Sequence, residues 1–145
     1  MIIPVTEKNL NEWAALCDAL WNDDDDGVAE DYIEEWQNGG LPHEFLYYIG
    51  DKAVAFVSLD LRHDYVEGTD TSPVGYLEGI YVKPEFQGRG IAREMVDFAK
   101  KWALARGCTE LASDCELTNE NSRLFHGKVG FEEANRIICF TMDLH

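Results

Sequence analysis

One stretch in the middle of the chain, residues 77–93, combines features that few folds accommodate. It reads LEGIYVKPEFQGRGIAR: an apolar run, a proline, a turn with two glycines and the start of a helical pattern. Gly88 and Gly90 allow backbone conformations that other residues avoid. The helix that follows directs free N–H groups and its positive dipole end toward the turn, where Arg89 and Arg93 add full charges. The stretch predicts a strand that leads into a phosphate-binding turn; from these residues alone, a glycine turn before an ordinary helix is the alternative.

Charge is distributed unevenly along the chain. The formal net charge is −16, yet residues 83–106 hold six of the twelve lysines and arginines. Residues 1–82 hold 18 acidic and 3 basic side chains. Most of such a surface repels a polyanion, which argues against nucleic acid as a partner. The distribution predicts an anionic ligand at the basic strip and a cationic ligand elsewhere, unless the acidity serves only solubility.

Length and composition bound the class of protein. At 145 residues the chain is expected to form a single domain, residues 1–145. It has no window of eighteen uninterrupted apolar residues and no basic-then-apolar start, so we expect a soluble cytoplasmic protein without a membrane partner. The four cysteines, Cys17, Cys108, Cys115 and Cys139, form no C-x-x-C pair. This pattern favours buried thiols in a reducing compartment over a metal site, and we expect no metal.

Hydrophobic periodicity predicts alternating helices and strands. Three strands in meander order come before the glycine turn, and a helix then crosses over to a parallel strand, which makes a β-α-β unit. We therefore expect an α/β fold with a mixed central sheet. The first predicted helix is capped by Thr6 and ends near Trp21; the other predicted helices are residues 28–36, residues 90–106 and one that ends at Lys128. The predicted strands are residues 45–49, 53–61, 74–82, 110–114 and 137–144.

Two motifs resemble the GCN5-related N-acetyltransferases. Gln87-x-x-Gly90-x-Ala92 after a strand resembles the pyrophosphate loop of that family, and Asn119 with the later pair Gly130-Phe131 resembles its closing segment. The resemblance covers nearly the whole chain. It implies an antiparallel N-terminal meander, a β-α-β core that binds acetyl-CoA, and acetyl-CoA as cosubstrate. A dinucleotide-binding fold fits less well, because the chain has a single β-α-β unit and Arg93 stands where the third glycine is needed.

The family resemblance implies roles for individual residues. Strand backbone around Ile80 would bind the pantetheine arm and polarise the thioester, while the turn and helix start bind the pyrophosphate. The family often uses a tyrosine to protonate the leaving thiolate, and this chain departs from that pattern with His126 at the position. The histidine ring could serve as the acid or simply pack. The implied cofactor-binding residues are Ile80, Tyr81, Val82, Gln87, Gly88, Arg89, Gly90, Ile91, Ala92, Arg93 and Asn119.

Within the family, the chain is most similar to the aminoglycoside 6′-N-acetyltransferases. The similarity lies in an aromatic before an acidic loop, in residues 63–73 (HDYVEGTDTSP), in residues 77–82 and in residues 112–114. It implies that four residues face a cationic sugar: Trp21, Tyr65, Glu78 and Asp114. The aspartates 23–26 would form an acidic lip beside them, or only a solvated loop. Glu78 lies among apolar and aromatic neighbours, so it needs a cationic or hydrogen-bonded partner if it is buried.

The resemblance implies direct transfer of an acetyl group to the 6′-amine of an aminoglycoside, as in antibiotic resistance. An ammonium group must lose a proton before it can attack, so we assign Glu78 as general base. We also expect a homodimer, because the group often pairs through its C-terminal half and strand 137–144 would leave an apolar edge. Acetylation of polyamines or of a protein amine stays open, as does a non-catalytic CoA sensor.

Overall fold

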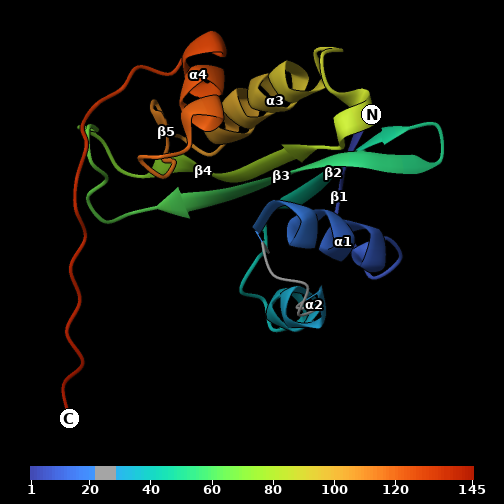
Figure 1. Ribbon diagram of the computed structural model, residues 1–145, viewed down its shortest axis with the longest axis horizontal. Helices are drawn as coiled ribbons and strands as arrows, with labels where there is room; N and C mark the ends of the chain where they lie inside the picture. The colour runs from blue at the N-terminus through green and yellow to red at the C-terminus, as the bar shows by residue number, and fades with distance from the viewer. Residues whose placement is uncertain (22–28) are drawn as a thin grey trace.

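A computed structural model describes residues 1–21 and 29–145. Five strands form one sheet in the order β1-β2-β3-β4-β5; all neighbours are antiparallel except β4 and β5, which are parallel. Figure 1 shows α1 and α2 on one side of this sheet and α3 and α4 on the other. The elements are β1 (Ile2–Pro4), α1 (Leu10–Trp21), α2 (Ala29–Gln37), β2 (Glu44–Ile49), β3 (Lys52–Arg62), β4 (Val74–Val82), the 3-10 turn η1 (Pro84–Phe86), α3 (Ile91–Ala105), β5 (Leu111–Ser113) and α4 (Glu120–Lys128).

Helix α3 covers one face of the sheet. Its apolar positions recur at helical spacing, and Met95, Ala99 and Trp102 are buried against β3 and β4. Gly75 lets the helix approach the sheet, since a Cβ at this position would lie 2.8 Å from the Cβ of Ala103. The predicted crossover helix is therefore confirmed. It carries the chain from the end of β4 back to β5, as a parallel pair requires.

Helix α1 covers the other face over β2 and β3. Trp13 and Cys17 of the helix and Leu46 and Phe56 of the strands are fully buried in this second cluster. Helix α2 packs on the outer side of α1 and adds half-buried aromatic residues to the cluster. Part of the sheet, where β4 meets β5, lies beyond these two helices (Figure 1). On β4 in this region the Glu78 side chain is exposed, whereas Val74 and Tyr76 are buried.

The C-terminal strand predicted over residues 137–144 is wrong. No residue beyond Lys128 belongs to a helix or strand, and Figure 1 shows the end of the chain leading away from the body. Phe140, Met142 and Leu144 are 82 to 89% exposed. Apolar residues do alternate along this segment, but a strand also needs the edge of a neighbouring strand with which to form hydrogen bonds. The segment instead leaves the body where Asn135 donates a hydrogen bond to Glu67 (2.6 Å).

Of the helices in the described ranges, none is long and apolar enough to cross a lipid bilayer. The predicted second helix agrees with α2 as far as it can be compared, since Val28 lies outside the described residues.

Candidate active site

Strands β4 and β5 pair over only three residues and then diverge. Gly75, Tyr76 and Leu77 pair with Leu111 to Ser113, after which β4 continues to Val82 paired with β3 but not with β5. Lys83 N donates to Val54 O on the β3 side (2.9 Å). Because backbone groups alternate in direction along a strand, those of Val82 and Ile80 point to the opposite, open side. Of the predicted cofactor residues, Ile80 and Val82 thus have backbone groups on the edge away from β3, whereas Tyr81 lies between them with its backbone toward β3.

The glycine turn continues directly from this edge. Gly88 and Gly90 have φ angles of 79° and 81°, which only glycine adopts readily. Gly90 precedes the first residue of α3 and offers no capping side chain, so the N–H groups of the first helical turn are open to a ligand. The side chain of Gln87 donates to Val82 O (3.0 Å) and ties the turn to β4.

The two arginines of this turn take different positions. The Arg89 guanidinium lies 5.0 Å from the centre of the Phe86 ring and makes a long contact to Glu85 O. The Arg93 guanidinium donates to Lys128 O at the end of α4 (2.8 Å). Arg89 is therefore the more available of the two for an anion at the turn, while Arg93 also holds α4 against α3.

Four side chains form a connected group beside the free edge, which we call the carboxylate cluster: Arg62, Tyr76, Glu78 and Asp114. The Arg62 guanidinium donates to Glu78 Oε1 (2.7 Å) and stacks 3.4 Å from the centre of the Tyr76 ring. The Tyr76 hydroxyl donates to Asp114 Oδ2. The cluster therefore joins the two carboxylates predicted to face a cationic ligand.

Electrostatics within the cluster follow from these contacts. Burial acts to lower the pKa of Arg62, but the hydrogen bond and charge of Glu78 outweigh it, and the pKa is raised. Burial, then the hydrogen bond to Asp114, raises the pKa of Tyr76, so its hydroxyl stays a donor. The Arg62 and Glu78 side chains are 39% and 31% exposed. An ion pair this open to solvent contributes at most about 1 kcal/mol, so a ligand can displace it.

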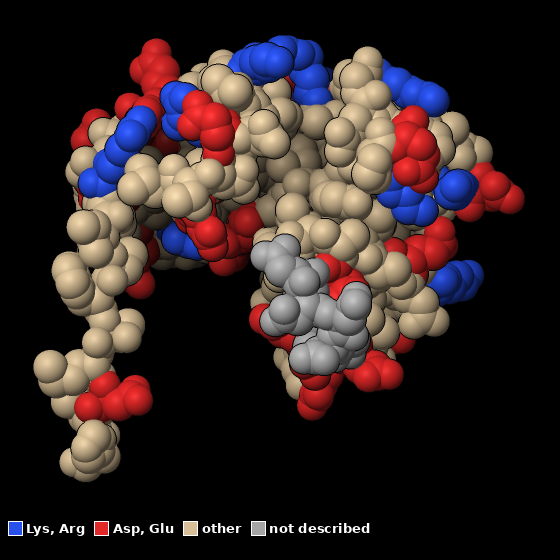
Figure 2. All heavy atoms as spheres, in the orientation of Figure 1, with Lys and Arg blue, Asp and Glu red and all other residues tan. Residues whose placement is uncertain are grey.

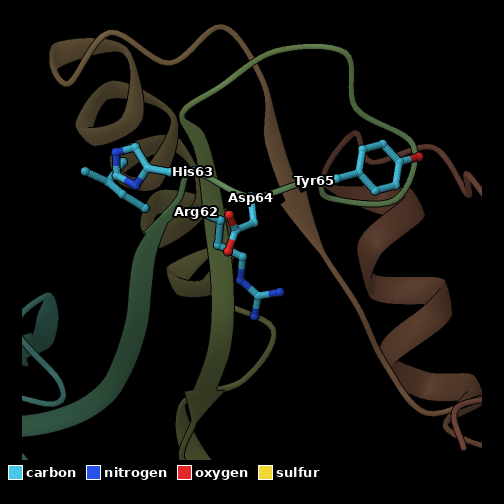
Figure 3. Close-up of a pocket in the computed structure, with 5 residues that line it drawn as sticks. Arg62, His63, Asp64 and Tyr65 are labelled. Carbon is cyan, nitrogen blue, oxygen red and sulfur yellow. The ribbon is translucent and has the colours of Figure 1, made fainter.

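The predicted aromatic residues border the same region. Trp21 ends α1 and lies over β4, where a Cβ at Gly79 would be 2.3 Å from its ring. Its ring meets Phe56 edge-on at 5.4 Å and remains 41% exposed. Tyr65 is 77% exposed on the loop after β3, where residues 61–65 line a cavity of about 420 Å³ (Figure 3).

Acidic side chains lie on the side of the body that faces the C-terminal segment. Figure 2 shows them along the open space between the body and this segment. The predicted acidic lip, residues 23–26, lies outside the described residues.

His126 lies on α4 at the point where β4 and β5 diverge. Its Nε2 is 2.8 Å from Ser113 Oγ, which in turn donates to Leu77 O (3.0 Å), and its Nδ1 is 2.7 Å from Ser122 O. The ring also packs beside Phe131 at 5.2 Å. These contacts orient the imidazole at the inner end of the free edge. Both the acid role and the packing role predicted for His126 are compatible with this position.

Asn119 caps the same helix. Its Oδ1 accepts a hydrogen bond from Ser122 N (3.1 Å), so one end of this amide has a structural task. The predicted role of Asn119 in orienting the cofactor would therefore use its Nδ2, which the helix cap does not use.

Strand β4 carries Glu78 of the carboxylate cluster, has an edge that β5 leaves unpaired, and leads through the glycine turn to α3, whose start has no capping side chain. The sequence matches the model of the acetyltransferase (GNAT) family over residues 8–131. The chain belongs to this family. The GNAT fold predicted from the two motifs is confirmed.

Individual relatives match almost the full chain. An aminoglycoside N(6′)-acetyltransferase type 1 of Stenotrophomonas maltophilia is 40% identical over 96% of this chain and 90% of its own length. One of Acinetobacter baumannii is 36% identical over 99% of this chain and 98% of its own length.

Among solved structures, the apo form of the aminoglycoside 6′-N-acetyltransferase AAC(6′)-Ig from Acinetobacter haemolyticus superposes with a TM-score of 0.91. It is 34% identical and covers 100% of this chain and 99% of its own. The structure of AAC(6′)-Iy with a CoA-S-monomethyl-acetylneamine bisubstrate analogue gives a TM-score of 0.87. It is also 34% identical and covers 99% of this chain and 98% of its own.

Two members of the carboxylate cluster were not among the predicted GNAT site residues. Arg62 was missed because the predicted strand stops at Leu61, whereas β3 extends one residue further. Tyr76 was treated only as an apolar neighbour of Glu78. Both residues could be found only from the strand register. Arg62 pairs with Val74, and Tyr76, two residues further along β4, points to the same face of the sheet as Val74. The need for a cationic partner at Glu78 was visible in the sequence, but its identity was not.

Proposed function

We propose that this GNAT protein is an aminoglycoside 6′-N-acetyltransferase that transfers the acetyl group of acetyl-CoA directly to the 6′-amine, which would confer resistance to the antibiotic. The observation that carries the proposal is the carboxylate cluster, placed beside the free edge of β4. A polycationic sugar needs several carboxylates within reach of an acetyl donor. The full-length relatives, which are aminoglycoside N(6′)-acetyltransferases, support the same acceptor.

The described residues fit acetyl-CoA as cosubstrate. The backbone groups of Ile80 and Val82 on the free edge would hydrogen-bond the pantetheine arm as a neighbouring strand does. The N–H groups at the start of α3, with Gly88 and Arg89, would hold the pyrophosphate. Acetyl-CoA supplies an acetyl group activated as a thioester.

The residues of the chain then have separate tasks in the reaction. Trp21 and Tyr65 border the acceptor, and Asp114 attracts its ammonium groups. Glu78 accepts a proton from the bound ammonium, directly or through water, so that the neutral amine has a free lone pair for attack. The C–N bond forms as the C–S bond breaks, the new amide nitrogen loses its second proton to water, and His126 Nε2 delivers a proton to the thiolate that leaves. No cysteine is needed, because the acceptor itself is the nucleophile.

A thiol-release assay tests this proposal. The protein is incubated with acetyl-CoA and a panel comprising kanamycin, tobramycin, a lincosamide without a 6′-amine, and spermidine. We expect CoA release with kanamycin and tobramycin alone. Release with spermidine but neither aminoglycoside would favour the polyamine reading, and tight CoA binding without release from any amine would favour a sensor. Equal rates with the lincosamide would remove the 6′-amine as the site of acetylation.

We also infer that the enzyme is a homodimer. Residues 137–144 carry alternating apolar side chains, and this segment holds five of the most exposed large hydrophobic residues. An extended segment of this kind is stabilised when it pairs with the sheet edge of a second copy, and a two-fold axis satisfies both copies at once. Sedimentation at micromolar concentration should give about twice the 16.5 kDa chain mass; a single species at the chain mass would refute the inference.

The proposal includes a cytoplasmic location. All four cysteines are free, and Cys115 and Cys139 are exposed thiols. Exposed thiols persist in a reducing compartment.

A further inference from the structure

The position of Arg62 is the feature of the carboxylate cluster that the proposed reaction does not use. Its guanidinium contacts Glu78 on one side and the face of the Tyr76 ring on the other. A carboxylate and an aromatic face together make a site for a cation. In the free protein that site is already filled by a side chain of the same chain.

Lysines and arginines are few in the first part of the chain. Residues 1–82 contain three of them, Lys8, Lys52 and Arg62, beside 18 acidic residues. Lys52 begins β3 and lies 5.5 Å from the Phe86 ring, beside the glycine turn, and Lys8 precedes α1. Figure 3 shows the Arg62 side chain extending away from those of His63 and Tyr65. Arg62 therefore stands out as a positive charge within an acidic part of the chain.

An acceptor ammonium bound at Glu78 must compete with this guanidinium. Both groups carry one positive charge and both donate hydrogen bonds to carboxylate oxygens. Glu78 can accept a proton from the acceptor only when the acceptor nitrogen, and not Arg62, is next to it. The Arg62 and Glu78 side chains are partly exposed, so the guanidinium has room to leave without unfolding the strand.

We propose that Arg62 is a built-in competitor of the acceptor: it holds the Glu78 and Tyr76 cation site in the free enzyme and is displaced when a polycationic acceptor binds. An acceptor with several ammonium groups gains contacts at Asp114 as it displaces Arg62. A simple monoamine gains no such second contact. Arg62 thus raises the number of charges that an acceptor needs, which makes it a specificity-determining residue. This inference rests on the proposed function, because it takes Glu78 as an acceptor ligand.

The test compares Arg62→Gln with a matched charge control. Arg123→Gln removes the same charge from an exposed arginine that is also paired with a glutamate, Glu120, but on α4. Tobramycin binding is measured by calorimetry without acetyl-CoA, and acetyl-CoA affinity and thermal melting report on the fold. We expect Arg62→Gln to bind tobramycin about three- to fivefold more tightly than wild type, Arg123→Gln to match wild type, and Arg62→Lys to stay closer to wild type than Arg62→Gln.

Each result decides between competition and its alternatives. An equal gain in Arg62→Gln and Arg123→Gln would overturn the inference, because net charge alone would explain it. Weaker binding in a folded Arg62→Gln would also overturn it and make Arg62 a ligand of the acceptor. If wild type neither binds nor acetylates tobramycin, the proposed function fails instead. If wild type does both and Arg62→Gln shows no gain, only the competitor role fails.

Discussion

Replacing Glu44 with glutamine should change how the stability of the protein depends on pH. Glu44 opens β2 and pairs across the sheet with Ser58, and its side chain is packed against α1 with only 3% of the residue exposed. Neither carboxylate oxygen accepts a well-formed hydrogen bond from a described residue. The nearby Trp13 indole N–H likewise donates no well-formed hydrogen bond to a described residue. An ionised carboxylate at this position would destabilise the folded state, because it is buried without a paired charge.

Burial therefore raises the pKa of Glu44 to about 8, although Ser58 and Trp13 offset part of the effect; the charges of Glu78 and Glu35 add to it. At pH 7 the folded protein holds this proton and the unfolded chain, with a pKa of 4.5, does not. The contribution of Glu44 to stability is therefore greatest below pH 4.5 and falls as pH rises toward 8. The slope is about 1.4 kcal/mol per pH unit, which amounts to about 3 kcal/mol by pH 7 and about 5 kcal/mol above pH 8.

Urea unfolding followed by tryptophan fluorescence, from pH 5 to pH 9, measures this directly. The free energy of unfolding of Glu44→Gln minus that of wild type should rise with pH and level off above pH 8. The buried amide adds a constant offset of about 1–3 kcal/mol, so the slope is the quantity to read. The exposed Glu34→Gln serves as the charge-matched control and should show no such slope. A pH-independent difference for Glu44→Gln would refute a neutral buried carboxyl.

Three further changes test the cofactor and acceptor sites. Arg89→Glu should weaken acetyl-CoA binding at least tenfold, about 1.4 kcal/mol, because an attractive contact becomes repulsive; unchanged affinity by calorimetry would move the pyrophosphate elsewhere. Gly79→Ala puts a methyl group 2.3 Å from the Trp21 ring, so the indole must shift and the aminoglycoside KM should rise severalfold at constant acetyl-CoA KM. Glu78→Gln should lower kcat for tobramycin at least a hundredfold as the general base is lost, and a kcat within threefold of wild type would assign the base elsewhere.

The fold was largely predictable because its elements carry strong local patterns. Helix α3 combines a clear apolar stripe with a glycine at each end, and β4 is followed by a proline and a glycine turn. Such signals need no knowledge of distant parts of the chain. The same holds for Gly88 and Gly90, whose positive φ angles follow from a turn that other residues would strain.

The errors arose where structure depends on partners far away in the sequence. Residues 137–144 have the alternation of a strand, but pairing requires an edge that the chain does not bring to them. Arg62 meets Glu78 only because β3 and β4 pair in one register, which a single sequence does not specify. The shift in that register between Ser58 and Leu59 is likewise invisible in composition or spacing.

The divergence of β4 from β5 leaves two kinds of recognition side by side: one by main-chain groups and one by side chains. On the open edge of β4, recognition is carried by main-chain groups, which every amino acid but proline presents alike. Mutations can accumulate there while the strand keeps the same donors and acceptors. The carboxylate cluster, by contrast, consists of side chains, and a single substitution changes its charge. Substitutions in the cluster can therefore alter which acceptor binds without disturbing how the strand edge binds the donor.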